Sequence, residues 1–324
     1  MTYSPNQYNM IKIAITGGLG HIGSSLIKEL PNYLRESEIT IIDNLSTQRY
    51  FSIFNLPSIS KYKFIEGDIR ELDLKSVLNH IDIVIHLAAI TDAAGSFEKA
   101  KEVESNNYES TKKLIEACSE TNTKIITLSS TSVYGSQSSL VDESCTASDL
   151  KPQSPYAETK LREEKIVQKW SQENNLKAIT LRFGTIFGAS PGMRFHTAVN
   201  KFCWQASLDQ PITVWETALN QKRPYLDLCD AIAAIVHIIN FDLFDGQIYN
   251  VLTENCTVKD IINEIRLIHN NVKIEFVKNK IMNQLSYEVS DEKFKHTGFN
   301  KRGSLRRGIR ETLNLLKQAN NLKY

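Results

Sequence analysis

The stretch Ile11-Lys12-Ile13-Ala14-Ile15-Thr16-Gly17-Gly18-Leu19-Gly20-His21-Ile22-Gly23 decides the fold that this sequence predicts. Its first part is apolar, β-branched and ended by glycines, which is typical of a buried strand. Gly17, Gly20 and Gly23 follow at the spacing G-x-x-G-x-x-G, and residues 24–30 are predicted as helix. Such glycines allow positive φ and a close approach of the backbone to a pyrophosphate, which the start of the helix would hold. The stretch could also be only a tight turn, so its surroundings must confirm a dinucleotide site.

A second predicted strand, residues 38–43, ends in Asp43, twenty positions after Gly23. An acid at this place can hydrogen-bond the adenosine ribose hydroxyls and would repel a 2′-phosphate. Asp43 therefore favours NAD over NADP as the cofactor. Arg49 is the alternative, as a partner for a 2′-phosphate, but it lies six residues further on and ranks lower.

Strands and helices alternate along the first half of the chain. Further strands are predicted at 62–66, 82–86, 124–128 and 177–182, with helices near 72–78, 106–118 and after Ser154-Pro155. This alternation predicts an α/β fold with a parallel sheet covered on both faces, in which ligands bind beyond the carboxyl ends of the strands. The residues expected at those ends are Gly17, Asp43, His86, Ser130 and Arg182.

The predicted domains follow from the same pattern. Residues 1–10 are a polar N-terminal extension, and 11–182 form the dinucleotide-binding domain. From residue 183 the pattern loosens into loops and short strands. Residues 183–227 and 253–324 are therefore predicted to form a smaller substrate-binding lobe, while a helix at 230–240 and a strand at 247–251 return residues 228–252 to the first domain.

Composition narrows the class of protein. The chain has 324 residues and a net charge of +1 without a long basic block, so nucleic acid is a poor partner. No apolar stretch is long enough to cross a bilayer, and the N-terminus lacks the layout of a signal peptide, so we expect a cytoplasmic protein with no membrane partner. Five scattered cysteines without a C-x-x-C pair predict reduced thiols and no metal site.

A catalytic group is predicted further along. Tyr156 and Lys160 stand four residues apart, on one face of a helix, and Ser130 closes a strand. A tyrosine of pKa ~10 is a poor base near pH 7, so its pKa would have to fall by roughly three units, about 4 kcal/mol. A lysine ammonium ~4 Å away supplies about that much at an effective dielectric of ~20. Most isolated Tyr-x-x-x-Lys pairs are solvated helix faces, and the dinucleotide turn upstream is what favours catalysis here.

In this order the motifs resemble those of the extended short-chain dehydrogenase/reductases, specifically the NAD-dependent nucleotide-sugar epimerase/dehydratase family. The resemblance runs from Ile11 to about residue 300. It implies a Rossmann-type, doubly wound parallel sheet with a smaller C-terminal lobe. The motifs are modest alone and specific together: Thr16 to Gly23, Asp43-Asn44-Leu45, Gly67-Asp68-Ile69, His86-Leu87-Ala88-Ala89, Ser129 to Gly135, Tyr156 with Lys160, Leu181-Arg182-Phe183, and Arg223-Pro224-Tyr225.

The resemblance implies roles for single residues. Tyr156 would be the base, Lys160 would lower its pKa and hold the nicotinamide ribose, and Ser130 would bind the same sugar oxygen. NAD would also contact Gly17, Gly20, His21, Ile22, Gly23, Asp43, Asn44, Asp68, Ile69, Leu87, Ala88, Ala89, Asn106, Asn107 and Ser129. A nucleotide-diphosphate sugar would contact Thr131, Thr185, Arg194, Asn200 and Arg223. In the alternative, Asn106 and Asn107 only cap a helix and Arg223 is a surface ion pair. The helices that carry the asparagines and the Tyr-Lys pair imply a homodimer.

Departures from the family pattern narrow the reaction. Dehydratases carry one or two acids directly after the catalytic hydroxyl residue, whereas this chain has Thr131 and Ser132, so elimination is disfavoured. Gly184-Thr185 and Thr91 stand where related 4-epimerases have an asparagine and a lysine. A second diphosphate-binding arginine is missing near residues 284–287, and Lys278 or Arg194 could replace it.

The sequence thus predicts an NAD-dependent nucleotide-sugar epimerase, acting at C4 of a nucleotide-linked hexose through a transient 4-keto sugar, in cell-surface polysaccharide synthesis. One alternative is a sugar-nucleotide 4-dehydrogenase or keto-reductase of the same family. A second is a non-catalytic, dinucleotide-binding regulator, against which the complete set of Ser130, Tyr156 and Lys160 argues.

Overall fold

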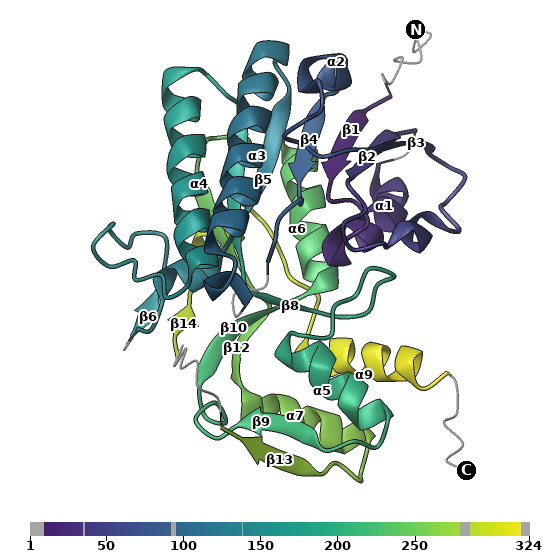
Figure 1. Ribbon diagram of the computed structural model, residues 1–324, viewed down its shortest axis with the longest axis vertical. Helices are drawn as coiled ribbons and strands as arrows, with labels where there is room; N and C mark the ends of the chain where they lie inside the picture. Colours follow the sequence, from purple (N-terminus) through teal and green to yellow (C-terminus); the bar gives the residue numbers. More distant parts are fainter. Residues whose placement is uncertain (1–9, 35, 92–94, 138, 279–285, 319–324) are drawn as a thin grey trace, which may run out of the picture.

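The computed structural model describes residues 10–34, 36–91, 95–137, 139–278 and 286–318. A large α/β domain fills one half of the molecule and a smaller lobe the other (Figure 1). Of the predicted N-terminal extension, all but Met10 lies outside the described residues.

The core of the large domain is a seven-stranded parallel sheet with the order β11-β7-β5-β4-β1-β2-β3. The chain runs outward from β1 to β3 and then resumes at β4 on the other side of β1. The order therefore reverses beside β1, where dinucleotides bind in such sheets. The strands are β1 (Lys12–Thr16), β2 (Glu38–Asp43), β3 (Lys61–Glu66), β4 (Ile83–His86), β5 (Lys124–Ser130), β7 (Ala178–Phe183) and β11 (Ile248–Val251).

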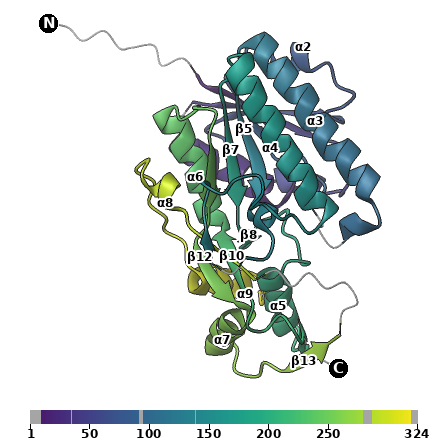
Figure 2. The same ribbon diagram turned by 90° about the vertical axis from the view of Figure 1, so that its left-hand side faces the viewer.

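Helices cover both faces of this sheet, which confirms the doubly wound prediction. Figure 2 shows α3 (Ala100–Thr121) and α4 (Pro155–Glu173) side by side on one face, with α6 (Leu228–Phe241) on the other. α2 (Leu74–Leu78) packs on α3, and α1 (His21–Tyr33) packs on α6. α3 buries Leu114, Ile115 and Cys118 against the sheet, the helical spacing expected from the sequence, and ends at Asn122 in the left-handed conformation.

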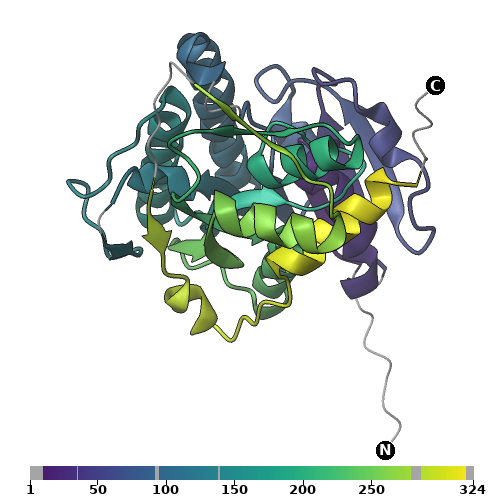
Figure 3. The same ribbon diagram turned by 90° about the horizontal axis from the view of Figure 1, so that it is seen from below.

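The smaller lobe has its own apolar core, formed by three helices and short strands. The helices are α5 (Ala198–Ser207), α7 (Val258–Ile268) and α9 (Leu305–Leu316), and α7 and α9 lie side by side when the molecule is seen from below (Figure 3). The lobe's strands are β8 (Thr185–Phe187), β10 (Lys222–Asp227), β12 (Glu254–Thr257), β9 (Ile212–Trp215) and β13 (Ile274–Val277). The described residues also form β6 (Leu140–Val141), which pairs with β14 (Glu288–Val289), and α8 (Glu292–Lys295). Short 3-10 helices lie at Tyr50–Ile53, Gly95–Phe97 and Thr131–Tyr134.

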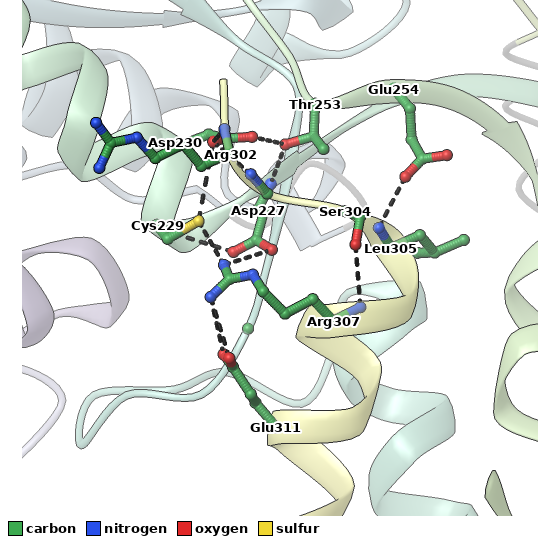
Figure 4. Close-up of polar contacts among 12 residues, drawn as sticks. Asp227, Cys229, Asp230, Thr253, Glu254, Arg302, Ser304, Leu305, Arg307 and Glu311 are labelled. Carbon is green, nitrogen blue, oxygen red and sulfur yellow. Dashed lines mark hydrogen bonds and ion pairs between the residues drawn. The ribbon is translucent and has the colours of Figure 1, made fainter. Parts of the chain in front are cut away.

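A buried acidic pair joins the lobe to the large domain (Figure 4). Asp227 caps the start of α6 and binds Arg307 of α9 at 2.8 Å. Asp230 accepts hydrogen bonds from the backbone N–H groups of Arg302 and Gly303, at 2.7 and 2.8 Å. A Cβ on Gly303 would lie 2.5 Å from Asp230 Oδ2, so this close approach needs a glycine. The segment that leads to α9 is therefore fixed to the first turn of α6.

The sequence-based elements differ from the structure at helix ends and in the lobe, where α5 and α9 were not predicted. α1 starts at His21, three residues before the predicted start, because Gly20 turns directly into the helix. α3 starts at Ala100, six residues before the predicted start, through a polar segment without an apolar stripe. β7 ends at Phe183 and β8 begins at Thr185, close to the predicted domain boundary at residue 182. That boundary remains a prediction. Within the described ranges, no helix is both long and apolar enough to span a membrane.

Candidate active site

The glycine turn is shaped for close backbone packing and leaves one open face. Gly17 has φ +65°, and a Cβ there would lie 2.6 Å from Ala88 N. A Cβ on Gly23 would lie 2.6 Å from Gly17 O, so α1 packs directly on the turn. At Gly20, in contrast, a Cβ would meet only Gly17 O, at 3.3 Å. Gly20 also caps α1 without a side chain. The N–H of Gly20 donates to Gly17 O at 3.1 Å. These features fit the pyrophosphate of a dinucleotide, which the N–H groups of His21 and Ile22 at the start of α1 would hold.

Asp43 follows β2 and faces this turn. Its carboxylate accepts hydrogen bonds from Leu19 N (3.1 Å) and Leu45 N (3.0 Å), which leaves acceptor sites for ribose hydroxyls. A pocket at the carboxyl ends of β2 and β3 is lined by Asn44, Glu66, Gly67, Asp68 and Glu71. The structure thus brings the predicted adenosine-side residues together. Ile69 is buried next to them.

Arg70 fixes the carboxylate of Asp68 with a two-pronged ion pair, at 2.9 Å from Nε to Oδ1 and 2.8 Å from Nη2 to Oδ2. The hydrogen bonds from Arg70 hold the pKa of Asp68 well below its usual range. Asn44 adds a contact at 3.4 Å. Asp68 is therefore preset as an acceptor.

The loop after β4 is fixed by hydrogen bonds from a side chain of α3. Asn107 is fully buried, and its amide clamps the backbone of Ile90 by accepting from the N–H (2.8 Å) and donating to the carbonyl (2.9 Å). Asn106 donates to Asn107 Oδ1 at 3.0 Å. The asparagines therefore shape the loop that carries Leu87, Ala88 and Ala89, and direct contacts with NAD remain a prediction.

Residues 188–194 lie across the glycine turn and tie the lobe to it. The ring of His21 hydrogen-bonds Gly188 O at 2.8 Å, and Gly192 N donates to Ser24 Oγ at 2.8 Å. A Cβ on Gly192 would lie 2.4 Å from the carbonyl oxygens of Leu19 and Gly20. Burial lowers the pKa of His21 to about 4, so its ring is neutral. His21 was predicted only as a cofactor residue, and its observed contact is with this loop.

Ser130, Tyr156 and Lys160 meet at the carboxyl edge of the sheet. Ser130 ends β5, and Ser154 caps α4 by accepting from Ala157 N at 3.2 Å. The cap places Tyr156 in the first turn of α4, where its side chain is hydrogen-bonded to Ser130. Lys160, one turn later, is buried. The three predicted catalytic residues are thus brought together.

The charges around Tyr156 do not act as the sequence suggested. Burial of the phenol raises the pKa of Tyr156, the Lys160 ammonium lowers it, and the Glu163 carboxylate raises it again. Arg194 and the hydrogen bond with Ser130 lower it further, yet the net shift is upward. For the chain's own charges, burial and Glu163 therefore outweigh Lys160. The expected lowering of this pKa by Lys160 together with the positive charge of oxidised NAD remains a prediction.

Two neighbouring acids of α4 were missed as site residues. Glu163 Oε2 lies 2.8 Å from Lys160 Nζ, and both side chains are buried. Glu164 forms a two-pronged ion pair with Arg182 of β7, with both contacts at 2.8 Å, and accepts from Ser129 Oγ. In the sequence they look like a solvated helix face, although Glu at i+3 from Lys is a helix-neighbour pair that could have been noticed. Ser129 was predicted to contact the cofactor, but its hydroxyl is used by Glu164.

The predicted substrate residues are more dispersed. Thr131 is buried, and its hydroxyl contacts Phe183 O and Tyr287 OH, both at 3.3 Å. Asn200 is fully buried and bridges Gly188 N and Arg194 O. Thr185 and Arg223 lie on the adjoining strands β8 and β10. Arg194 contacts Thr91 Oγ1. Its positive charge lowers the pKa of both Tyr156 and His21.

Comparison with known proteins agrees with this geometry. Residues 13–251 match the family model described as the NAD dependent epimerase/dehydratase family. The match covers more than half of the chain, which therefore belongs to this family, and its dinucleotide is NAD.

Similar proteins include both reaction types. The chain is 29% identical to a trifunctional UDP-glucose 4,6-dehydratase/UDP-4-keto-6-deoxy-D-glucose 3,5-epimerase/UDP-4-keto-L-rhamnose-reductase of Arabidopsis thaliana over 96% of its own length and 47% of that protein. It is 29% identical to the human dTDP-D-glucose 4,6-dehydratase over 93% of the chain and 89% of that protein. The crystal structure of a UDP-glucuronic acid 4-epimerase from Bacillus cereus with UDP-glucuronic acid and NAD superposes with a TM-score of 0.85, at 27% identity, covering 95% of this chain and 99% of the other. The chain thus spans about half the length of the Arabidopsis protein.

A neutral, buried histidine next to the site predicts a pH-dependent stability. Burial, and secondly the charge of Lys160, lower the pKa of His86 to about 3, from 6.5 in an unfolded chain. The unfolded state then binds more protons, so the stability contributed by neutral His86 is present above pH 6.5 and lost as the pH falls toward 3. The unfolding free energy of wild type should exceed that of His86→Gln at pH 7. We expect this difference between the two proteins to decrease by about 2 kcal/mol as the pH falls from 7 to 5.

Urea unfolding at several pH values measures this difference. His296→Gln, on an exposed ring, is the control and should follow wild type at every pH. Parallel curves for wild type and His86→Gln would contradict the assignment of a neutral, buried ring.

Proposed function

We propose that the chain is an NAD-dependent nucleotide-sugar epimerase that acts at C4 of a nucleotide-linked hexose through a 4-keto sugar. The observation that carries the proposal is the meeting of Ser130, Tyr156 and Lys160 beside the glycine turn. The similarity to the Bacillus cereus 4-epimerase over nearly the full length of both chains supports it.

The chain's residues would divide the work of the reaction. With the Lys160 ammonium and the positive charge of oxidised NAD beside it, the Tyr156 phenolate would accept the proton of the sugar hydroxyl as its carbon is oxidised, and would later return it. Ser130 Oγ hydrogen-bonds the same sugar oxygen and stabilises its charge. Lys160 keeps a positive charge beside the phenolate. NAD bound at the glycine turn would supply a hydride acceptor that is regenerated when the keto sugar is reduced on its other face, so it would not be consumed.

The residues after Ser130 favour epimerisation over the dehydration that several relatives perform. Ser132 Oγ donates to Ser130 Oγ at 2.9 Å, and the Thr131 hydroxyl is held by protein partners. Neither residue is an acid that could protonate a leaving hydroxyl. Glu163 and Glu164, the acids in contact with the site residues, are held in ion pairs by Lys160 and Arg182.

Two alternatives remain open to test. A sugar-nucleotide 4-dehydrogenase or keto-reductase would release its product at a different oxidation level, and would need NAD or NADH from solution. A non-catalytic regulator would bind NAD without turnover.

We expect the purified protein to interconvert at least one pair of 4-epimeric nucleotide sugars without added NAD. Nuclear magnetic resonance of a panel of UDP-, dTDP-, GDP- and CDP-hexoses measures this. Tyr156→Phe should lower kcat by about 10²–10⁴-fold, the usual contribution of a positioned acid–base group. Tyr33→Phe, on an exposed ring, is the matched control and should keep full activity. Net production of NADH would favour the dehydrogenase, and no turnover of any sugar would favour the regulator.

Arg194 is the proposed anion-binding residue on the substrate side. It is partly buried between the turn and Tyr156, at the end of the loop fixed by His21 and Asn200. Lys278 is the other candidate, but it directly follows β13 at the far end of the lobe (Figure 1). Residues 284 and 285, where the family arginine was expected, lie outside the described residues.

Arg194→Ala should raise KM by about 10–100-fold, because a hydrogen bond to a charged group contributes roughly 1.5–3 kcal/mol. The exposed Arg310→Ala is the control and should keep the wild-type KM. Equal increases for UDP-glucose and UDP-glucuronic acid would assign Arg194 to the diphosphate. A larger increase for UDP-glucuronic acid would assign it to a sugar carboxylate, and an unchanged KM would exclude both.

A homodimer through α3 and α4 is also proposed, with an unusual interface. Among the described residues, the large apolar side chains with high exposure all lie outside α3 and α4. The surface of α3 and α4 instead carries charges. Arg162 of α4 pairs with Glu104 of α3, and its guanidinium lies 4.5 Å from the centre of the Tyr108 ring.

Because charges would form much of this interface, we expect a dimer that weakens as salt screens them. Light scattering of the purified protein at low and high salt measures the mass. A monomer at low salt would contradict the dimer, and a dimer insensitive to salt would contradict its charged character.

A further inference from the structure

The ammonium of Lys160 is held by a carboxylate that the proposed reaction does not use. Glu163 Oε2 lies 2.8 Å from Lys160 Nζ, and both side chains are almost completely removed from solvent, with 7% and 5% exposed. Glu163 Oε1 has no hydrogen-bond partner among the described residues. A buried carboxylate is costly unless it is paired, so this residue needs an explanation beyond helix formation.

A chain of hydrogen bonds leads from the glycine turn to this carboxylate. Thr111 Oγ1 donates to Glu163 Oε2 at 3.0 Å, so it must accept from His86 Nε2 at 3.2 Å. His86 is neutral, so its Nδ1 accepts from Thr16 Oγ1 at 2.7 Å. Thr16 Oγ1 in turn accepts from Ala88 N at 3.3 Å.

Every hydroxyl and ring nitrogen in this series of hydrogen bonds has a partner when each group donates toward Glu163, where the series ends. The residues come from β1, β4 and α3, and together they hold the carboxylate in one place. The hydrogen bonds also favour its charged form over the neutral acid.

The charges that face Tyr156 show what a fixed carboxylate does there. Lys160 and Glu163 approach from α4 itself, Arg194 from the loop after β8, and the uncharged Ser130 from β5. Glu164, the next residue of α4, is already paired with Arg182. The Lys160–Glu163 pair carries no net charge, so the field of the lysine at the phenol is partly cancelled.

We propose that Glu163 is a positioning residue for catalysis, which fixes Lys160 Nζ beside Tyr156 and limits how strongly the lysine charge stabilises the phenolate. The proposal rests on the proposed role of Tyr156 as the base. A tyrosine that both accepts and returns a proton must be able to exist as phenol and as phenolate. When Glu163 balances the charge of Lys160, the proton affinity of the Tyr156 phenolate stays high enough for the step in which the sugar receives its proton back.

The test is the titration of Tyr156 in Glu163→Gln. The amide oxygen can still accept from Lys160 and Thr111, so the variant removes the charge and keeps the contacts. The absorbance of tyrosinate against pH, with NAD present and with the Tyr156→Phe curve subtracted, gives the midpoint for this one residue. We expect the midpoint to fall by on the order of one pH unit, from Coulomb's law at a separation of about 7–10 Å. The rising limb of epimerase activity against pH should move down equally.

Three further variants separate charge from structure. Glu158→Gln removes an exposed carboxylate from the same helix and should leave the midpoint unchanged. Thr111→Val breaks the hydrogen-bond chain but keeps the Glu163 charge, so its shift should be much smaller than that of Glu163→Gln. Glu163→Asp keeps the charge but withdraws it from the lysine, and should give an intermediate fall even if Glu163→Gln does not fold.

An unchanged or higher midpoint in folded Glu163→Gln would overturn the proposal, as would an equal shift in Thr111→Val. The titration needs no sugar substrate. A protein that turns over no nucleotide sugar would therefore refute the proposed epimerase while the midpoint still decides the role of Glu163.

Discussion

The pairing of buried charges along α4 is the constraint on which the site depends. Glu163 and Glu164 are consecutive, so they point to different sides of the helix, and both are buried. Glu164 is held by Arg182 from β7, and Glu163 by Lys160 together with Thr111 from α3. Because a buried charge without its partner costs several kcal/mol, about 3–5, α4 has one rotation about its axis that satisfies both acids. That rotation directs Tyr156 toward Ser130 at the edge of the sheet.

A second constraint connects the cofactor half of the molecule with the substrate half. Gly188 and Gly192 of the loop after β8 bind His21 and Ser24 of α1, and Asn200 joins Gly188 to Arg194. The position of Arg194 is therefore set by the same backbone that would hold the NAD pyrophosphate. Loss of one of these contacts would therefore disturb both sites. His21, predicted only to contact the cofactor, also fixes the loop that ends at Arg194.

The parallel sheet and the meeting of Ser130, Tyr156 and Lys160 could be predicted because each rests on a local pattern: apolar runs, a glycine spacing and an i,i+4 pair. The order of the strands was not predicted and comes from the structure. Helix starts were less accessible, since α1 begins directly after Gly20 and α3 begins in a polar segment without an apolar stripe. The upward shift in the pKa of Tyr156 could not be predicted, because it depends on burial and on Glu163. A pair of adjacent glutamates reads as solvated in a sequence, and only the packing of α3 and β7 against α4 shows that both are buried.

The acids around Tyr156 bear on the choice between the proposed epimerisation and dehydration. In the proposed mechanism the oxidation that starts either reaction would use Tyr156, Lys160 and NAD, and the edge of the sheet and α4 place the two side chains. Elimination needs in addition an acid that is free to protonate the leaving hydroxyl. Here the positions after Ser130 hold hydroxyls bound to Ser130, Phe183 and Tyr287, and the buried acids are committed to cations. Among the described residues in contact with Ser130, Tyr156 and Lys160, none is therefore an acid free to complete an elimination, which supports the proposed epimerisation.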